Sequence, residues 1–264
     1  MERLIILFTV LFCCVHAKSQ SFDWGNATPE EQGYSSQKIQ AMRDTLAAHK
    51  TTSILVISND KIILEWYAPG WERKQHGTAS LAKALVGGMS LLLALNDGRM
   101  QVDDPVCKFI PEWKNDPLRS KITIRHLATH SSGIEDAEIT QKDIDEAKAR
   151  GIEIKDKHMD IPGWKGSFWR KDPDPFTVSR DQAPVLFQPG TDEAYSNPGM
   201  AMLAYAVTAS YQGTQYKNIR TLLSDRIYKP IGIKDNEYSI GYGKTYPVNG
   251  LELVANWGGA SFTP

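Results

Sequence analysis

Hydrophobic and polar positions alternate along the first third of the chain in patterns that predict one helix and two strands. Between residues 36 and 49 the apolar positions recur at helical spacing, which predicts an amphipathic helix. The stretches 52–58 and 61–67 are rich in β-branched and aromatic residues, and only Asn59 and Asp60 separate them. A two-residue connection of this kind is typical of a β-hairpin with a tight turn.

The longest apolar run extends from Ala84 to Leu95 and has no polar face. A helix that is apolar on every side is expected to be surrounded by protein, and Gly98 supplies its stop signal. Gly87 and Gly88 inside this run each cost about 1 kcal/mol relative to alanine in a helix. Their presence predicts that another backbone passes close to them.

The second half of the chain alternates turn-rich stretches with helical ones. We expect a strand or short helix that ends in a turn, an insertion with one helix and otherwise loop, two further helices, and a loop-like remainder; these occupy 122–134, 135–181 with its helix near 142–150, 200–210, 218–228, and the residues after 232. Trp164, Phe168 and Trp169 in the insertion have two interpretations. They form a lip over a substrate cleft, or, as is commoner for such aromatics, they pin a long loop to the body.

Composition excludes some classes of partner. The 264 residues suffice for one large domain or for a domain built from two halves, and 30 basic against 31 acidic residues give a net charge of -1. This balance offers no electrostatic reason to bind nucleic acid or an anionic membrane. A small or peptide substrate is therefore the expected partner, and the oligomeric state stays open.

The N-terminus resembles an export signal. A short charged start precedes an apolar segment, residues 4–15, that is too brief to span a bilayer comfortably, and Val15-His16-Ala17 offers small residues for cleavage. We expect residues 1–17 to be a signal peptide, with an uncleaved anchor as the lesser alternative. The mature protein would be periplasmic or secreted, without stable membrane insertion, and Cys107 would be its one cysteine.

Ser80 and Lys83 open the long apolar run. Residues three apart on a helix share a face, with Cβ atoms about 5 to 6 Å apart, so Lys83 can hydrogen-bond Ser80. A serine becomes a useful nucleophile only beside a group that takes its proton. Taken alone, this spacing occurs by chance in many helices.

Tyr195 and Asn197 lie two residues apart in a turn-rich loop before the helix predicted at 200–210. Residues i and i+2 of an extended segment point the same way, so a phenol and an amide can converge on one cleft. A tyrosine has an ordinary pKa of about 10 and becomes a useful base only beside cations. Lys83 is such a cation.

Four stretches together resemble a known family. Thr78–Lys83, His126–Ile134, Phe187–Thr191 and Tyr195–Asn197, in this order and at these intervals, are similar to the motifs of the penicillin-recognising serine hydrolases. Within that superfamily the chain resembles the branch of class C β-lactamases, D-alanyl-D-alanine carboxypeptidases and related esterases and amide hydrolases.

The resemblance implies an α+β fold, with an antiparallel sheet flanked by helices and an inserted, mostly helical domain. In this layout one β-lactamase-related domain covers 18–264, with the N-terminal portion of its α/β half at about 30–105 and the helical half at about 106–250. The C-terminal strands of the α/β half would be missing.

The resemblance also implies roles for the four residues. Ser80 would attack a carbonyl and become acylated, while its backbone N–H supplies one arm of the oxyanion hole. Tyr195 would accept the serine proton and pass one to the leaving group, with Lys83 as base or as positive neighbour. Asn197 would orient Lys83 and bind the substrate carbonyl. Water would release the acyl group, and neither a metal nor another cofactor is implied.

One motif of the family is not found. The third motif of the family is Lys-Thr-Gly or His-x-Gly, whereas Gly243–Tyr246 carries tyrosine in place of the glycine. This stretch also lies before Gly258-Gly259, which matches the Gly-Gly stretch of the family. We therefore expect a fragment of a longer enzyme, or else a short protein with little activity. A catalytically silent member that binds peptides or acts as a sensor is the rival from another class. Substrate choice among β-lactam, peptide and ester stays open.

Three other side chains invite a functional interpretation that the sequence does not favour. His130 is expected to hold a turn rather than to donate protons, and His126 to be structural. Cys107 lacks a histidine-bearing motif, so a packed free thiol is expected. The histidines do not have metal-ligand spacing.

Overall fold

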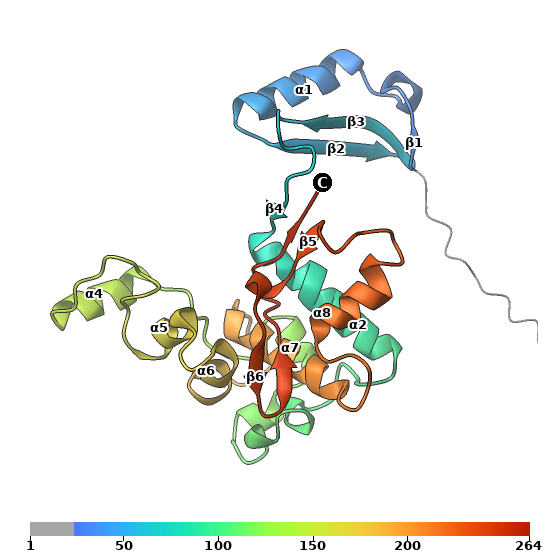
Figure 1. Cartoon of the computed structure of the whole chain (residues 1–264). Coiled ribbons are helices and arrows are strands. Elements are labelled where there is room, and N and C mark those ends of the chain that lie inside the picture. The colour runs from blue at the N-terminus through green and yellow to red at the C-terminus, as the bar shows by residue number, and fades with distance from the viewer. Residues whose placement is uncertain (1–23) are drawn as a thin grey trace, which may run out of the picture.

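A computed structural model describes residues 24–264 as an α+β fold (Figure 1). The predicted signal peptide, residues 1–17, lies outside the described residues. The first sheet has the strand order β1-β3-β2, with β1 at Gly25–Asn26, β2 at Ser53–Ser58 and β3 at Lys61–Tyr67. β2 and β3 are antiparallel, whereas β1 runs parallel to β3. In Figure 1 this sheet and α1, Ser36–Ala48, form one end of the molecule.

The predicted hairpin is confirmed. Ser58 pairs with Lys61, and both residues of the connection, Asn59 and Asp60, have positive φ, at 46° and 58°. Two successive left-handed residues match the twist of the strands they connect, and asparagine and aspartate tolerate this conformation better than most side chains.

The first predicted helix is confirmed as α1, Ser36–Ala48, and Ser35 caps it by accepting from the Lys38 N–H. Its apolar face is not buried, however, because Met42 and Leu46 are each 37% exposed. The sheet beside α1 is small, and Ile63 is its one buried side chain among the described strands.

The Ser80 region is less regular than the predicted single helix. A 3-10 turn, Ala79–Leu81, leads into a π-helix, Lys83–Gly88, which continues as α2, Met89–Asn96. One side packs into the core against α7, Asn197–Ser210, but the opposite side is open, with Leu81 58% and Leu92 60% exposed. The expectation of burial on every side is therefore wrong. By length and hydropathy alone Ala79–Asn96 would pass for a membrane span, a test that core helices pass as well.

The two glycines of this segment differ in their surroundings. A Cβ on Gly87 would lie 2.7 Å from Met200 Cε and 3.1 Å from the buried amide nitrogen of Asn256, whereas one on Gly88 would meet only Lys83 O at 3.7 Å. The predicted close approach of another backbone is therefore wrong. Side chains from elsewhere in the fold crowd Gly87, and Gly88 has room.

Alanine substitutions at these two glycines should therefore have opposite effects. We expect Gly87→Ala to lower the free energy of unfolding by about 1 to 2 kcal/mol, because buried neighbours must shift. Gly88→Ala, the matched control, should raise it by up to about 1 kcal/mol through helix propensity. Urea unfolding of both variants checks this prediction, and equal losses in the two would contradict it.

The helices of the second half build the core around α7, which is buried over most of its length. It is contacted by α2, by α3 at Ile124–Ala128 and by α6 at Pro175–Asp181. Three expectations are confirmed: the short helix in 122–134, the helix near 142–150 and the one at 218–228. The expectation of loop elsewhere in the insertion is wrong. Asp174 caps α6 with Pro175 at its first turn, a start signal that the sequence contains. The remaining helices are α3 Ile124–Ala128, α4 Gln141–Ala149, α5 Gly163–Arg170, α6 Pro175–Asp181 and α8 Ile219–Leu223. A π-helix, Ser224–Tyr228, continues α8. Short 3-10 turns occupy Glu30–Gln32, Val106–Lys108, Pro111–Trp113, Arg119–Lys121 and Gly241–Gly243.

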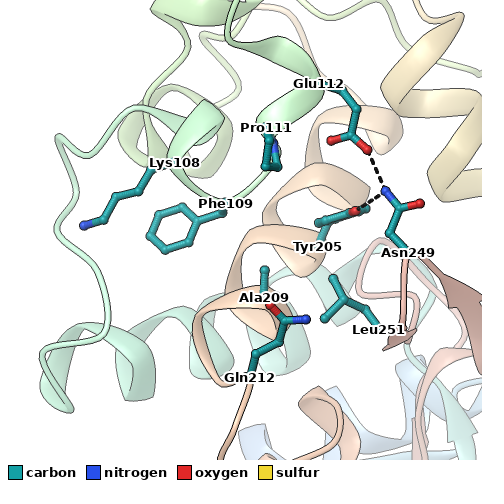
Figure 2. A pocket seen from close by; sticks show the side chains of 9 residues that line it. All are labelled: Lys108, Phe109, Pro111, Glu112, Tyr205, Ala209, Gln212, Asn249 and Leu251. Atoms are coloured by element: carbon teal, nitrogen blue, oxygen red, sulfur yellow. Dashed lines mark hydrogen bonds between the residues drawn. The ribbon is translucent and has the colours of Figure 1, made fainter.

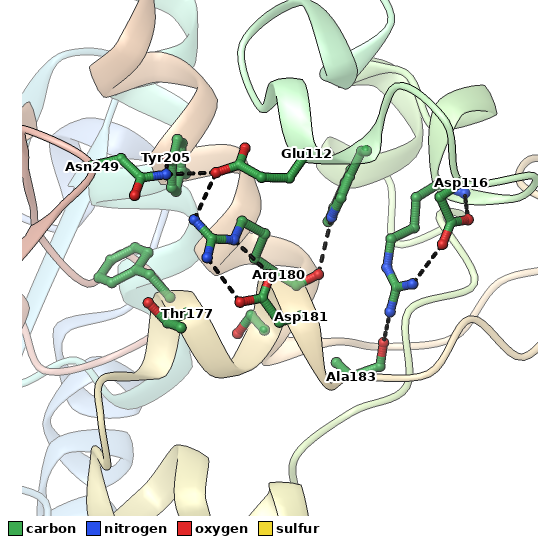
Figure 3. Close-up of polar contacts among 12 residues, drawn as sticks. Glu112, Asp116, Thr177, Arg180, Asp181, Ala183, Tyr205 and Asn249 are labelled. Carbon is green, nitrogen blue, oxygen red and sulfur yellow. Dashed lines mark hydrogen bonds and ion pairs between the residues drawn. The ribbon is translucent and has the colours of Figure 1, made fainter.

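A polar network fixes α6 to the loops that precede the insertion (Figure 3). The Arg180 guanidinium pairs with Glu112 at 2.9 Å and Asp181 at 2.7 Å, and these carboxylates raise its pKa. The Trp113 indole donates to the Arg180 carbonyl oxygen at 3.0 Å. Arg119 pairs with Asp116 and donates to a carbonyl just beyond α6.

The residues after 232 contain strands, so the expectation of a loop-like remainder is wrong. β6, Tyr246–Val248, and β7, Leu251–Leu253, form a hairpin around Asn249-Gly250, a dipeptide that is a strong hairpin signal. β4, His76–Gly77, and β5, Tyr238–Ser239, both pair with β8, Ser261–Phe262. This second sheet fastens the stretch before Ser80 to the end of the described chain.

Candidate active site

Ser80 is an exposed residue in the 3-10 turn Ala79–Leu81. Lys83 follows at the start of the π-helix, and its Nζ donates to Ser80 Oγ at 3.3 Å. The predicted contact between the two side chains is therefore present, although a 3-10 turn rather than an α-helix creates it.

Tyr195 and Asn197 reach the same point from the N-terminus of α7. Ser196 caps this helix by accepting from the Gly199 N–H at 2.8 Å, and its extended backbone places the residues on either side toward Ser80. The Tyr195 hydroxyl donates to Ser80 Oγ at 2.6 Å. Asn197 Oδ1 accepts from Lys83 Nζ at 2.7 Å. Asn197 begins the helix, which starts three residues earlier than predicted.

The two side chains differ in exposure. Tyr195 is 47% exposed, whereas Asn197 is only 6% exposed. Tyr195 is therefore accessible from solvent, whereas the Asn197 amide is packed into the helix end.

A backbone carbonyl that sequence reasoning missed completes the surroundings of Lys83. Nζ donates to the carbonyl oxygen of Trp257 at 2.8 Å. This segment is held against the Ser80 turn, because the Thr78 N–H donates to Ala260 O at 2.9 Å and β4 pairs with β8. Every residue has a backbone carbonyl, so no residue type marks this one in the sequence. The Gly258-Gly259 pair that follows Trp257 was the one signal that this segment matters.

Lys83 has neutral hydrogen-bond acceptors only. No carboxylate among the described residues forms an ion pair with it, and its Nζ lies 4.5 Å from the centroid of the Tyr195 ring. An ammonium without a countercharge is available to stabilise negative charge on the neighbouring oxygen atoms. The site thus combines an exposed hydroxyl, a phenol and a fixed cation.

A second layer of residues supports the Tyr195 segment. The His130 ring stacks on Tyr195 with centroids 4.8 Å apart, and its Nδ1 accepts from the Ser196 N–H at 3.2 Å. Asp136 accepts from the Asn197 N–H at 2.8 Å. Burial raises the pKa of Asp136, and burial together with the Lys83 charge lowers that of His130. His130 lies in the turn after α3, and from there its ring also contacts the extended segment that bears Tyr195.

His126 has a structural contact of the expected kind, because its Nδ1 accepts from the Thr123 N–H and completes a capping box on α3. Cys107 is a half-buried free thiol. The side-chain hydroxyl of Thr245 and the carbonyl of Lys244 accept from Arg220 rather than approaching Ser80.

The aromatic residues of the insertion pack inward. Phe168 is buried against Trp257, with ring centroids 5.2 Å apart, and the Trp169 indole donates to Ala137 O at 2.7 Å. These contacts favour the interpretation that the aromatics pin the insertion to the body. Because the Trp257 carbonyl accepts a hydrogen bond from Lys83, the packing of Phe168 on Trp257 also stabilises the position of Lys83.

A surface cavity of about 550 Å³ lies apart from these residues (Figure 2). Its polar lining is already used for packing, because Asn249 Nδ2 donates to Glu112 at 2.6 Å and to the Tyr205 hydroxyl at 3.1 Å. Within residues 24–264, no group of three or more His, Cys, Asp or Glu side chains is placed to hold a metal ion.

Comparisons with known proteins place this geometry in context. A protein of Salmonella agona, described as a candidate D-alanyl-D-alanine carboxypeptidase, is 21% identical over 241 residues, which cover 81% of this chain and 50% of that protein. The chain thus spans about half the length of the curated relatives that it matches over most of its own length.

Solved structures share the fold. A penicillin-binding protein from Bacillus halodurans has a TM-score of 0.56 at 18% identity, over 84% of this chain and 69% of that one. A D-amino acid amidase from Ochrobactrum anthropi SV3 has a TM-score of 0.53 at 18% identity, over 83% of this chain and 63% of its own. The α+β, β-lactamase/transpeptidase-like fold predicted from the sequence is therefore confirmed.

The family assignment has separate support. The model of the family described as Beta-lactamase matches residues 39–242, which include Ser80, Lys83, Tyr195 and Asn197. This match covers most of the chain, and we conclude that the protein belongs to the Beta-lactamase family, whose members are hydrolases.

Proposed function

We propose that this protein is an exported serine hydrolase that cleaves an amide or ester through an acyl-enzyme on Ser80. The substrate class comprises β-lactams, D-amino-acid peptides and small esters. The observation that carries the proposal is the 2.6 Å contact between the Tyr195 and Ser80 hydroxyls beside an ammonium with neutral partners only. Family membership and relatives described as a carboxypeptidase and an amidase support it.

The first half of the reaction transfers the acyl group. Tyr195 first loses to solvent the proton that its hydroxyl donates to Ser80 at rest. Ser80 Oγ then attacks the substrate carbonyl carbon, its proton passes to the Tyr195 oxygen, and the electrons of the C=O bond move to the carbonyl oxygen. Lys83 stabilises the charge that moves between these atoms. When the tetrahedral intermediate collapses, the C–N or C–O bond breaks and the leaving group takes the proton from Tyr195.

The second half hydrolyses the ester on Ser80. Water attacks its carbonyl carbon and gives a proton to Tyr195, and collapse releases the acid and returns a proton to Ser80 Oγ. Asn197 fixes Lys83 in both halves through its 2.7 Å contact. The 47% exposure of Tyr195 leaves room for substrate and water.

Mass spectrometry tests the proposal directly. After incubation with a penicillin or an activated ester, we expect an acyl adduct on the peptide that contains Ser80, lost slowly as water deacylates it. The same spectrum should show a mature N-terminus at Lys18 if residues 1–17 are removed on export. An adduct on another residue would contradict the assignment. Saturable binding of both compounds without an adduct would favour the silent binding protein.

A further inference from the structure

His130 contacts the Tyr195 segment at three points. Its ring stacks on the Tyr195 ring at 4.8 Å and 29°, its Nδ1 accepts from the Ser196 N–H, and its carbonyl oxygen accepts from the Ala194 N–H at 2.9 Å. Three successive residues of the segment that presents Tyr195 are thus held by one histidine. Its backbone is left-handed, with φ of 58°, so the turn directs both its ring and its carbonyl toward that segment.

The contact with Ser196 fixes the protonation state of the ring. A backbone N–H can donate to Nδ1 only if that nitrogen carries no proton, so the imidazole must be neutral with its hydrogen on Nε2. Protonation would place an N–H against the Ser196 N–H. The contact would be lost, and a positive charge would face Lys83.

We propose that neutral His130 is the positioning residue that holds Tyr195 against Ser80, and that its protonation releases Tyr195 and sets the acid limit of the reaction. This inference rests on the proposed function. In this role the histidine controls the position of Tyr195, which differs from donating a proton and from only holding its own turn.

The charged and titratable groups around His130 determine the pH at which this happens. Lys83 opposes protonation, as does burial of the ring, whereas Asp136 and Glu193 favour it. Tyr195 faces the ring itself. The net effect lowers the pKa of His130 from its ordinary value of 6.5, with burial as the largest cause. The acid limit that His130 sets should therefore lie below pH 6.5.

Two substitutions separate the roles of the ring. In His130→Asn the amide Oδ1 replaces Nδ1 as an acceptor without titrating, and asparagine tolerates the left-handed backbone. We expect this variant to keep at least about a tenth of kcat at neutral pH and to lose the acid limit. His130→Phe keeps the stack but has no acceptor. Its kcat should fall by about 10²-fold at every pH with KM nearly unchanged.

His126→Asn is the matched control. Its Nδ1 also accepts a backbone N–H, and burial also lowers its pKa, but it caps α3 and does not contact Tyr195. This variant should retain the acid limit of the natural protein. An unchanged acid limit in His130→Asn, or its loss in His126→Asn, would overturn the proposal.

A readout without turnover keeps the inference separate from the proposed function. Long-range ¹H–¹⁵N NMR of the imidazole should show neutral His130 with its proton on Nε2 at pH 7 and a change at the Tyr195 ring as His130 titrates. A charged His130 ring at pH 7, or a Tyr195 signal that does not change as His130 titrates, would refute the inference even if Ser80 is acylated. If NMR agrees but no Ser80 adduct forms, the proposed function fails and the positioning contact stands.

Stability should respond to the same titration. Because the pKa of His130 is lower in the folded state, the unfolded chain binds more protons between the two values. The contribution of His130 is therefore complete above pH 6.5 and declines as the pH falls through its folded pKa. Urea unfolding should show a smaller acid loss in His130→Asn than in the natural protein.

Discussion

Replacement of Ser80 by alanine is expected to lower kcat/KM for a chromogenic ester by about 10⁴-fold or more. The reason is chemical, since no other described hydroxyl receives both the Tyr195 contact at 2.6 Å and the Lys83 contact at 3.3 Å. Ser80 is exposed, so its loss should leave the fold intact. Initial rates at saturating and limiting substrate measure the effect, with circular dichroism to verify folding.

Ser120→Ala is the matched control for this substitution. Ser120 lies in a 3-10 turn, and its hydroxyl does not belong to the constellation around Lys83. This variant should keep the activity of the natural protein. If Ser80→Ala were to keep more than about a hundredth of kcat/KM, the acyl-enzyme on Ser80 would be excluded as the main route.

Replacement of Lys83 by methionine is expected to lower kcat by about 10³-fold. Methionine has a similar length but cannot donate to Asn197 or to the Trp257 carbonyl, and it brings no charge beside Tyr195. Three acceptors, Ser80 Oγ among them, would lose their shared donor, so the free energy of unfolding should also fall by about 1 to 3 kcal/mol. The kinetic loss must therefore be measured where the variant is fully folded.

Lys108→Met separates the specific effect from the loss of any lysine. Lys108 is an exposed cation paired with Asp104 at 3.0 Å, outside the site. Its removal should change stability by less than about 1 kcal/mol and leave kcat unchanged. A Lys83→Met variant with full kcat would show that the serine proton leaves by another path.

The elements with local signals were predictable from the sequence. Asn59 and Asp60 specify the hairpin turn through their own backbone preferences, and Ser80 and Lys83 meet because three residues make one turn. Their convergence with Tyr195 and Asn197 came from a resemblance to a family rather than from local physics. The structure brings the four residues together, and their roles stay proposals.

The missed features depend on tertiary context. The apolar run after Lys83 has no polar face, yet only the fold decides that Leu92 is exposed and Leu91 buried. The Trp257 carbonyl cannot be singled out in the sequence, because every residue has a backbone carbonyl. By contrast, the Asn249-Gly250 hairpin and the Asp174 cap have local signals in the sequence that predict them.

The three hydrogen bonds of Lys83 join points that lie far apart in sequence: Ser80, Asn197 and Trp257. Closing loops of such length requires most of the core between them to be in place. In a nascent or unfolded chain Ser80 is consequently an ordinary alcohol that does not react with esters. If Ser80 is acylated as proposed, its acylation rate would report whether all three segments have reached their folded positions.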